Sequence, residues 1–318
     1  MIAVLALLLA LAPSARAADF DMSKPPVVPA MRAVKLPPRV EWKLKNGLSV
    51  VLVEDRRLPM ITAILATQGG EAALPAEDAG LADATAELLT DGTKLKSSRQ
   101  IAEAAEMFGG YLGAGASPDA TYVEASALSD KADAMFALLS EVVREPSFPE
   151  AEVSLRKANM QQELDESRAQ SDFLSGVVFD KKIFAGHPYA SATPTDASIA
   201  RLNRERVLAA YRRLLTPRGA ILVLVGDLTA ARARSLVGER FGMWSGGEPA
   251  ADAPPVSAPK AERRVYLLDR PKSTQVSFNL GNLAAREDNP AYFDLLAVNG
   301  VLGGSFSSRL VRDRKSVV

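Results

Sequence analysis

Two acidic residues, Asp83 and Glu87, stand four positions apart in an otherwise apolar stretch of the chain. If residues 80–90 form a helix, both carboxylates lie on one face of it, because residues i and i+4 are neighbours on a helix surface. Carboxylate oxygens are the ligands that Ca²⁺, Mg²⁺ and Mn²⁺ prefer. The same spacing is also typical of a solvated acidic face. A metal site and an ordinary surface therefore both stay open as interpretations.

His187 is the only histidine, and the chain contains no cysteine. These counts exclude disulfides, thiolate metal sites, cysteine nucleophiles and every site that needs two imidazoles, including most catalytic zinc sites. The chain also has no G-x-S-x-G stretch that would indicate a serine nucleophile beside this histidine. Because His187 precedes Pro188 in a predicted turn, we interpret it as structural rather than catalytic.

The charge balance narrows the class of protein further. The 318 residues hold 38 Lys and Arg against 38 Asp and Glu, so the formal net charge is zero. Such a chain lacks the basic surface of nucleic-acid-binding proteins and of polybasic proteins that bind membrane surfaces. With 47% hydrophobic and 24% charged residues, its composition is that of a globular protein rather than a disordered one.

The two carboxylates lie within a mixture of predicted strands and helices, which indicates an α+β fold. Ser97 and Gln100 form a capping box that predicts a helix start. Pro149 predicts the first turn of a longer helix that runs to about Arg168. Further helices are predicted over residues 130–142, 202–215 and 229–241, and strands over residues 48–53, 60–67, 111–116, 121–128, 220–225, 264–268 and 275–280.

The second half of the chain weakly repeats the first. The run Val50–Asp55 is similar to Val265–Asp269 at an offset of about 215 residues, which suggests two copies of one domain. A linker rich in glycine and proline at residues 245–260 would separate a first domain at 41–244 from the start of a second at 261–318. We expect the second domain to be truncated.

Both ends of the chain carry further signals. Residues 1–17 resemble a secretory signal peptide with an A-x-A cleavage site, and residues 18–40 form a proline-rich lead-in. Export without cysteine fits the periplasm or cell surface of a bacterium, and no later apolar run is long enough to span a membrane. At the other end, residues 313–318 can be back-translated into a common sequencing-adapter read, so we expect them to be adapter-derived.

Residues 80–93, GLADATAELLTDGT, resemble the signature stretch of the pitrilysin/insulinase family of zinc peptidases, whose core is the inverted zinc motif H-x-x-E-H. The resemblance extends from about residue 40 to 312 and implies two related domains, each an antiparallel-rich sheet with helices on one face. Five further motifs follow the family's order: Asn46-Gly47-Leu48, Phe148-Pro149, Gly186–Tyr189, Val225–Asp227 and Gly303–Leu310.

The chain departs from the family at each chemical position of the motif. Asp83 and Glu87 replace the two histidines that bind zinc, and Ala86 replaces the glutamate that activates a water molecule. Alanine cannot accept a proton, so the general base is missing. The resemblance places the third metal ligand near Glu163, which with Asp83 and Glu87 would complete a carboxylate cluster.

The departures from the family's motif therefore predict an inactive homologue, and residues 1–17 predict that it is exported. We expect this chain to hold no cofactor and to pair with an active, zinc-bearing family member as a heterodimer that binds peptide substrate. Arg309 resembles the family's arginine that holds the substrate backbone, so the resemblance implies a role in substrate binding. An arginine in an ion pair on a surface helix is the alternative that stays open. Two alternatives stay open: a divergent metal-dependent endopeptidase that uses Asp83, Glu87 and Glu163, and a stand-alone peptide-binding scaffold.

Overall fold

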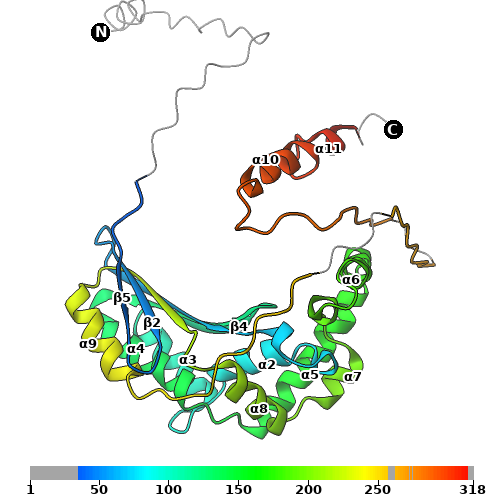
Figure 1. Cartoon of the computed structure of the whole chain (residues 1–318). Coiled ribbons are helices and arrows are strands. Elements are labelled where there is room, and N and C mark those ends of the chain that lie inside the picture. Colours follow the sequence, from blue (N-terminus) through cyan, green and yellow to red (C-terminus); the bar gives the residue numbers. More distant parts are fainter. Residues whose placement is uncertain (1–34, 257–261, 272, 274, 314–318) are drawn as a thin grey trace, which may run out of the picture. The chain divides into compact units, whose positions relative to one another are not determined.

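The computed structural model describes residues 35–256, 262–271, 273 and 275–313. Six strands form one sheet in the order β1-β2-β6-β3-β5-β4 (Figure 1). Neighbouring strands are antiparallel except β2 and β6, which run parallel. The strands are β1 Val40–Lys43, β2 Ser49–Glu54, β3 Met60–Gln68, β4 Tyr111–Ala116, β5 Ala120–Leu128 and β6 Ile221–Gly226.

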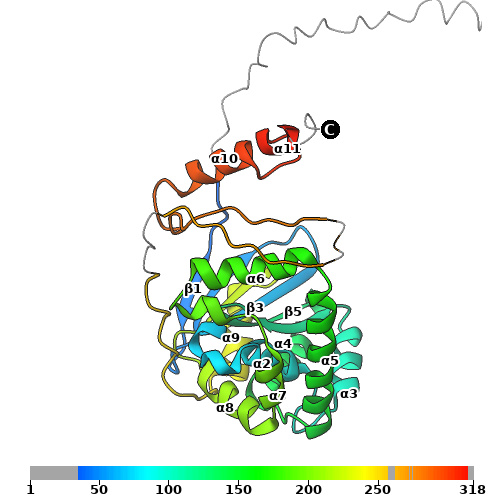
Figure 2. The same cartoon turned by 90° about the vertical axis from the view of Figure 1, so that its right-hand side faces the viewer.

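Helices cover one face of this sheet, as the resemblance implied (Figures 1 and 2). The long helix predicted after Pro149 is present as α5, and the capping box at Ser97 opens α3 as predicted. The helices of this region are α2 Leu81–Glu87, α3 Ser98–Met107, α4 Ala132–Arg144, α5 Glu150–Arg168, α6 Ser171–Ile183, α7 Asp196–Arg201, α8 Arg204–Leu214 and α9 Ala230–Phe241.

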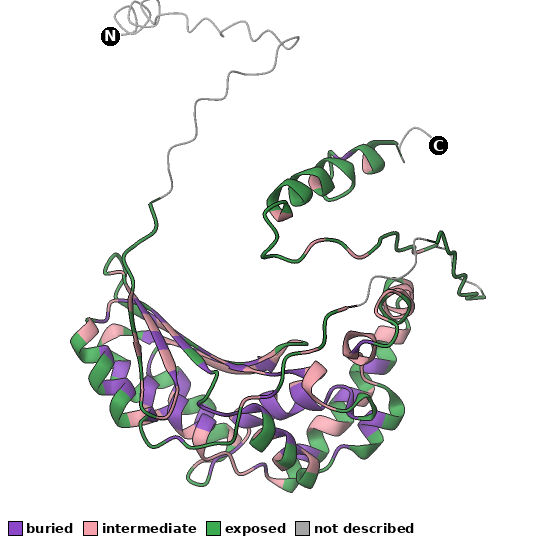
Figure 3. Ribbon diagram, in the orientation of Figure 1, coloured by how far each residue is buried: buried purple, intermediate pink, exposed green. Residues whose placement is uncertain are grey.

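Alternating burial along β3 explains why only one face is covered. Ile61, Ala63 and Leu65 are fully buried on the face that meets the helices, whereas Met60 and Ile64 are exposed on the other face. Because successive side chains of a strand point to opposite faces, this pattern fixes the side on which the helices pack. The buried residues accordingly gather between the sheet and the helices (Figure 3).

The strands predicted over residues 264–268 and 275–280 are wrong. Among the described residues no strand follows β6, and the elements after it are α9, α10 (Tyr292–Leu302) and α11 (Arg309–Asp313). A strand forms only where a neighbour accepts its backbone hydrogen bonds. In the first domain the counterpart of residues 264–268 is β2, which lies between β1 and β6; no strand in the described part of the second domain offers the same pairing.

The predicted linker has neither helix nor strand between residues 245 and 256, and its end at 257–261 lies outside the described residues. It does not leave the first domain at once, because Ala250 is buried and Gln68 Nε2 donates to Asp252 Oδ1 at 2.7 Å. The predicted signal peptide, residues 18–34 of the lead-in and residues 314–318 also lie outside the description. No helix in the described part is both long and apolar enough to cross a membrane.

Candidate functional site

Helix α2 carries the degenerate motif at the edge of the core. Leu81, Ala82 and Ala84–Ala86 are buried, and Ala86 is 0% exposed, so the position of the missing general base is a methyl group packed in the interior. Asp83 and Glu87 lie on the opposite, half-exposed face, as their spacing predicted. A water molecule at this site would find no proton acceptor at position 86.

A carboxylate from outside the motif fixes the start of this helix. Glu71 Oε2 accepts from the Gly80 N–H at 3.1 Å, and Glu71 Oε1 accepts from the Asp83 N–H at 3.0 Å. The Asp83 N–H is among the groups that a helix leaves without partners in its first turn. Gly80 has φ +86°, a conformation that favours glycine, and the turn there lets α2 begin under Glu71. The motif is thus anchored at its N-terminus by a largely buried acid.

Helix α5 brings a cation to the motif. The Arg156 guanidinium lies among the three acidic residues that were predicted as a cluster. Its Nε is 2.9 Å from Glu87 Oε2, its Nη1 is 3.1 Å from Glu163 Oε1 and its Nη2 is 3.7 Å from Asp83 Oδ2. Only 12% of the Arg156 side chain is exposed. The structure therefore places Asp83, Glu87 and Glu163 together, as predicted, around a guanidinium.

A cavity of about 390 Å³ opens beside this cluster. Its charged lining residues are Glu71, Asp83, Arg156 and Glu163, and its remaining lining includes Met160, Leu164, Phe173 and the β4–β5 turn at Ser117 and Pro118. Its volume lies within the range of roughly 300–1,000 Å³ that is typical of ligand sites. A few charged groups on one wall and apolar side chains on the others suit a peptide side chain or a small organic molecule.

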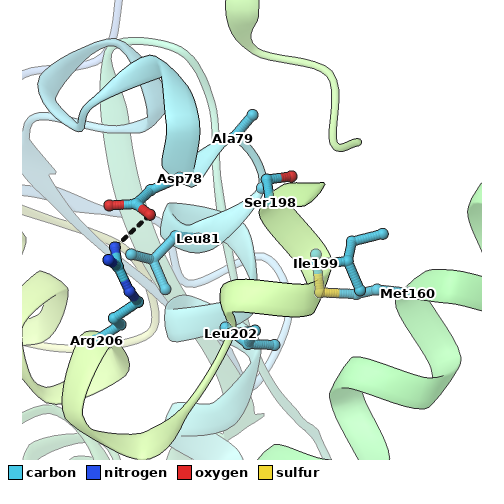
Figure 4. Close-up of a pocket in the computed structure, with 9 residues that line it drawn as sticks. Asp78, Ala79, Leu81, Met160, Ser198, Ile199, Leu202 and Arg206 are labelled. Carbon is cyan, nitrogen blue, oxygen red and sulfur yellow. Dashed lines mark hydrogen bonds and ion pairs between the residues drawn. The ribbon is translucent and has the colours of Figure 1, made fainter. Parts of the chain in front are cut away.

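A second cavity lies next to α2 on the side of η2 (Ala76–Asp78) and is too small for a ligand. Its volume is about 10 Å³, which is at most the space of one water molecule. The Asp78 carboxylate pairs there with the guanidinium of Arg206 (Figure 4), and Arg201 Nε lies 3.4 Å from Asp78 Oδ1. We interpret this ion pair as part of the packing between η2, α7 and α8.

Burial dominates the electrostatics of the site. It raises the pKa of Glu71 to about 7, against the lowering effect of the N–H groups that the carboxylate accepts from. Burial also raises the pKa of Glu87, and the Arg156 charge partly offsets that effect. The carboxylates of Asp83 and Glu163 add to the increase, because like charges disfavour ionisation. With a pKa of about 7, Glu71 changes its charge near neutral pH.

We expect the free energy of unfolding of this domain to fall between about pH 4 and pH 8 through Glu71. Because the pKa of Glu71 in the folded state lies above its ordinary value of 4.5, the folded protein holds a proton that the unfolded chain releases. The stabilisation is complete below the ordinary pKa and is lost as the pH rises through 7. Across this pH window the free energy of unfolding of wild type, measured by urea unfolding, should fall by roughly 3 kcal/mol more than that of Glu71→Gln. Glu77→Gln, a control on the neighbouring η2, should follow wild type; parallel curves for wild type and Glu71→Gln would contradict this assignment.

His187 is 8% exposed and both ring nitrogens are engaged by the backbone. Its Nδ1 accepts from the Tyr189 N–H at 3.2 Å, so Nε2 carries the proton and donates to the Pro254 carbonyl at 2.6 Å. The residue thus ties the chain after the first domain to the segment that follows α6, in agreement with a structural interpretation. Arg309 begins α11 and is exposed, and its assignment to substrate binding stays a prediction.

Two residues of the site, Arg156 and Glu71, were not predicted from the sequence. Arg156 stands seven positions before Glu163 on the predicted long helix, so both fall on one helix face. That spacing was a usable signal for a cation beside the carboxylates. Glu71 gave no comparable signal, because its role depends on burial under α2 and on a contact with a backbone N–H group twelve positions away.

Two family descriptions match the chain over adjoining ranges. Insulinase (Peptidase family M16) matches residues 49–190, and the Peptidase M16 inactive domain matches residues 201–315. The chain belongs to the insulinase family, peptidase family M16. The resemblance to this family is therefore confirmed. At positions 83, 86 and 87 this member has aspartate, alanine and glutamate in place of the motif's two histidines and glutamate.

Similar bacterial proteins include one named as a zinc protease and one named as a non-peptidase homolog. "Uncharacterized zinc protease YmxG" of Bacillus subtilis is 24% identical over 86% of this chain and 66% of its own length. "Non-peptidase homolog YmxG" of Helicobacter pylori is 25% identical over 56% of this chain and 42% of its own. A crystal structure of the peptidase M16 inactive domain from Pseudomonas fluorescens superposes with a TM-score of 0.75 at 25% identity, covering 86% of this chain and 66% of that one. This chain thus spans two thirds or less of these proteins.

The residues of this site do not fit the zinc ion that the family's motif binds. Both imidazole positions hold carboxylates, and a guanidinium lies among the three carboxylates that could replace them. A metal ion and a guanidinium at one place would repel each other. We therefore derive no catalytic step through zinc in this chain.

Proposed function

We propose that this chain is the non-catalytic, peptide-contacting subunit of an exported metallopeptidase pair. The observation that carries the proposal is the buried methyl group of Ala86 at the position of the general base. The motif helix and the sheet are preserved around it, so the chain keeps the scaffold of a peptidase without the group that would activate water. Chemistry on a peptide would then depend on a second chain with an intact H-x-x-E-H motif.

The cavity beside α2 supports the peptide-contacting part of the proposal. It combines apolar walls with charged groups and ends at the turn between β4 and β5, where an extended chain could lie along the sheet. Arg309 would add a further contact to the substrate backbone. Export rests on residues 1–17, whose pattern is that of a signal peptide.

The test is co-expression of this chain with an intact relative encoded in the same genome. We expect the chain alone to hydrolyse no casein or unstructured peptide, with or without added zinc. The two chains should co-elute, and the pair should cleave peptides at least about tenfold faster than the relative alone. Arg309→Ala should lower kcat/KM of the pair without preventing co-elution, and Arg312→Ala, on the same short helix, is the matched control.

Other results would select an alternative. Peptide hydrolysis by the chain alone that a chelator abolishes would overturn the proposal and favour the divergent metallopeptidase. Peptide binding by the chain alone, with no stable partner among the encoded relatives, would favour the stand-alone scaffold, since the cavity needs no second chain to be present.

A further inference from the structure

The three carboxylates at the degenerate motif share one cation. Asp83 and Glu87 come from α2, whereas Glu163 and Arg156 come from α5, and each carboxylate has an oxygen within 3.7 Å of a guanidinium nitrogen. The three acids are about half exposed, but the arginine side chain is 12% exposed and lies between them. The guanidinium is therefore the centre of the cluster and its least exposed member.

We propose that Arg156 replaces the family's metal ion in this chain, as a resident cation that holds α2 against α5 and excludes divalent cations from the carboxylates. A guanidinium suits this role because it is planar, stays protonated and presents donors in several directions. Its Nη1 donates a hydrogen bond to Glu163 Oε1, whereas its Nε and Nη2 lie within ion-pair distance of Glu87 and Asp83. With the guanidinium in place these three side chains form no metal site: in the part of the chain that the structure describes, no group of three acidic or histidine side chains is arranged to hold a metal ion.

The charge balance explains why the two cations exclude each other. With Arg156 present, the cluster has three negative charges against one positive charge, and the positive charge sits at the point where the three acids meet. A divalent ion that bound there would have to displace a largely buried guanidinium or lie next to it. Without Arg156, three uncompensated carboxylates would remain together, an arrangement with the oxygen ligands that Mn²⁺ and Ca²⁺ prefer.

Arg156→Met tests the proposal, because methionine keeps an unbranched side chain and removes the charge. In wild type we expect no saturable Mn²⁺ binding by calorimetry and no change in the unfolding midpoint on addition of EDTA. In Arg156→Met the midpoint should fall by about 5 °C at neutral pH. The variant should bind Mn²⁺ at least about tenfold more tightly than wild type, and Mn²⁺ or Ca²⁺ should restore the midpoint.

Two variants complete the design. Arg168→Met, on the same helix, removes an exposed ion pair with Asp196 and should leave Mn²⁺ binding at the level of wild type. If Arg156→Met does not fold without metal, the double variant Arg156→Met/Glu87→Gln takes its place, because it has one uncompensated carboxylate fewer. That double variant should fold and still bind Mn²⁺ more tightly than wild type.

Stoichiometric Mn²⁺ or Zn²⁺ in wild type, with loss of stability on chelation, would overturn the proposal. The proposal would also be overturned if Arg156→Met bound Mn²⁺ no more tightly than wild type does. If Arg156→Met does not fold, the same criterion applies to the double variant. Both results are measured on this chain alone and do not depend on an active partner. The test of this proposal is therefore independent of the co-expression test.

Discussion

A variant that carries D83H, A86E, E87H and R156M is expected to bind zinc at least about a hundredfold more tightly than D83H/A86E/E87H, a difference of about 2.7 kcal/mol. Restoring the motif alone places two imidazoles beside a guanidinium that already occupies their meeting point. Removing that guanidinium leaves two histidines one helical turn apart, with Glu163 from α5 as the third ligand. Competition against a chromophoric chelator measures both affinities.

The control for this prediction keeps the positive charge at position 156 and changes the shape of the side chain that carries it. D83H/A86E/E87H/R156K should bind zinc as weakly as the variant with the native arginine, because an ammonium group still opposes the metal. Equal zinc affinity of the restored motif with and without the R156M substitution would show that Arg156 does not exclude the metal. Recovery of peptide hydrolysis by the variant with R156M would in addition show that the glutamate introduced by A86E can reach a zinc-bound water.

Gly226→Ala is expected to destabilise the sheet by about 3 kcal/mol or more. Gly226 is the last residue of β6 and has φ +137°. A Cβ atom there would lie 2.1 Å from the Met60 carbonyl oxygen and 2.8 Å from Ile61 Cα, both on the neighbouring β3. Because these are backbone atoms, no side-chain rotation relieves the overlap, and the ladder between β3 and β6 must shift.

Gly238→Ala is the matched control. Gly238 lies within α9, and a Cβ atom there would meet nothing within 4 Å. Alanine is a better helix former than glycine by up to about 1 kcal/mol, so this variant should be neutral or slightly more stable. Urea unfolding of the two variants measures the difference, and similar midpoints would contradict the steric argument.

The first domain could be predicted from sequence where local patterns and burial agree. Leu48–Val53 and Ala220–Val225 are largely apolar runs flanked by turn residues, and each coincides with a strand of the central sheet to within one residue at either end. The box at Ser97 opens α3 because the Ser97 N–H donates to Gln100 Oε1 at 3.0 Å, a contact that two residue types three apart already specify. In these places short-range chemistry and the final fold select the same conformation.

Prediction failed where long-range contacts decide the structure. Helix α6 contains no buried residue, so it has no apolar stripe for a pattern to reveal. Val265–Leu268 has a strand-like composition and forms no strand, because its conformation depends on neighbours and not on its own side chains. About half of the site could be predicted. The motif indicated Asp83 and Glu87, and the family resemblance placed the third acid near Glu163. The guanidinium between the three acids became visible only once α5 was placed against α2.

The parallel pairing of β2 and β6 has a consequence for biosynthesis. Strand β6 lies between β2 and β3, although it follows β3 by about 150 residues in the chain. The sheet therefore stays split until Ile221–Gly226 has been made, and sequence-distant pairings of this kind slow folding. During that interval β2 and β3 present open strand edges, which are sites for aggregation. A nascent or shortened chain that ends before residue 221 is thus expected to depend on a chaperone to stay unaggregated.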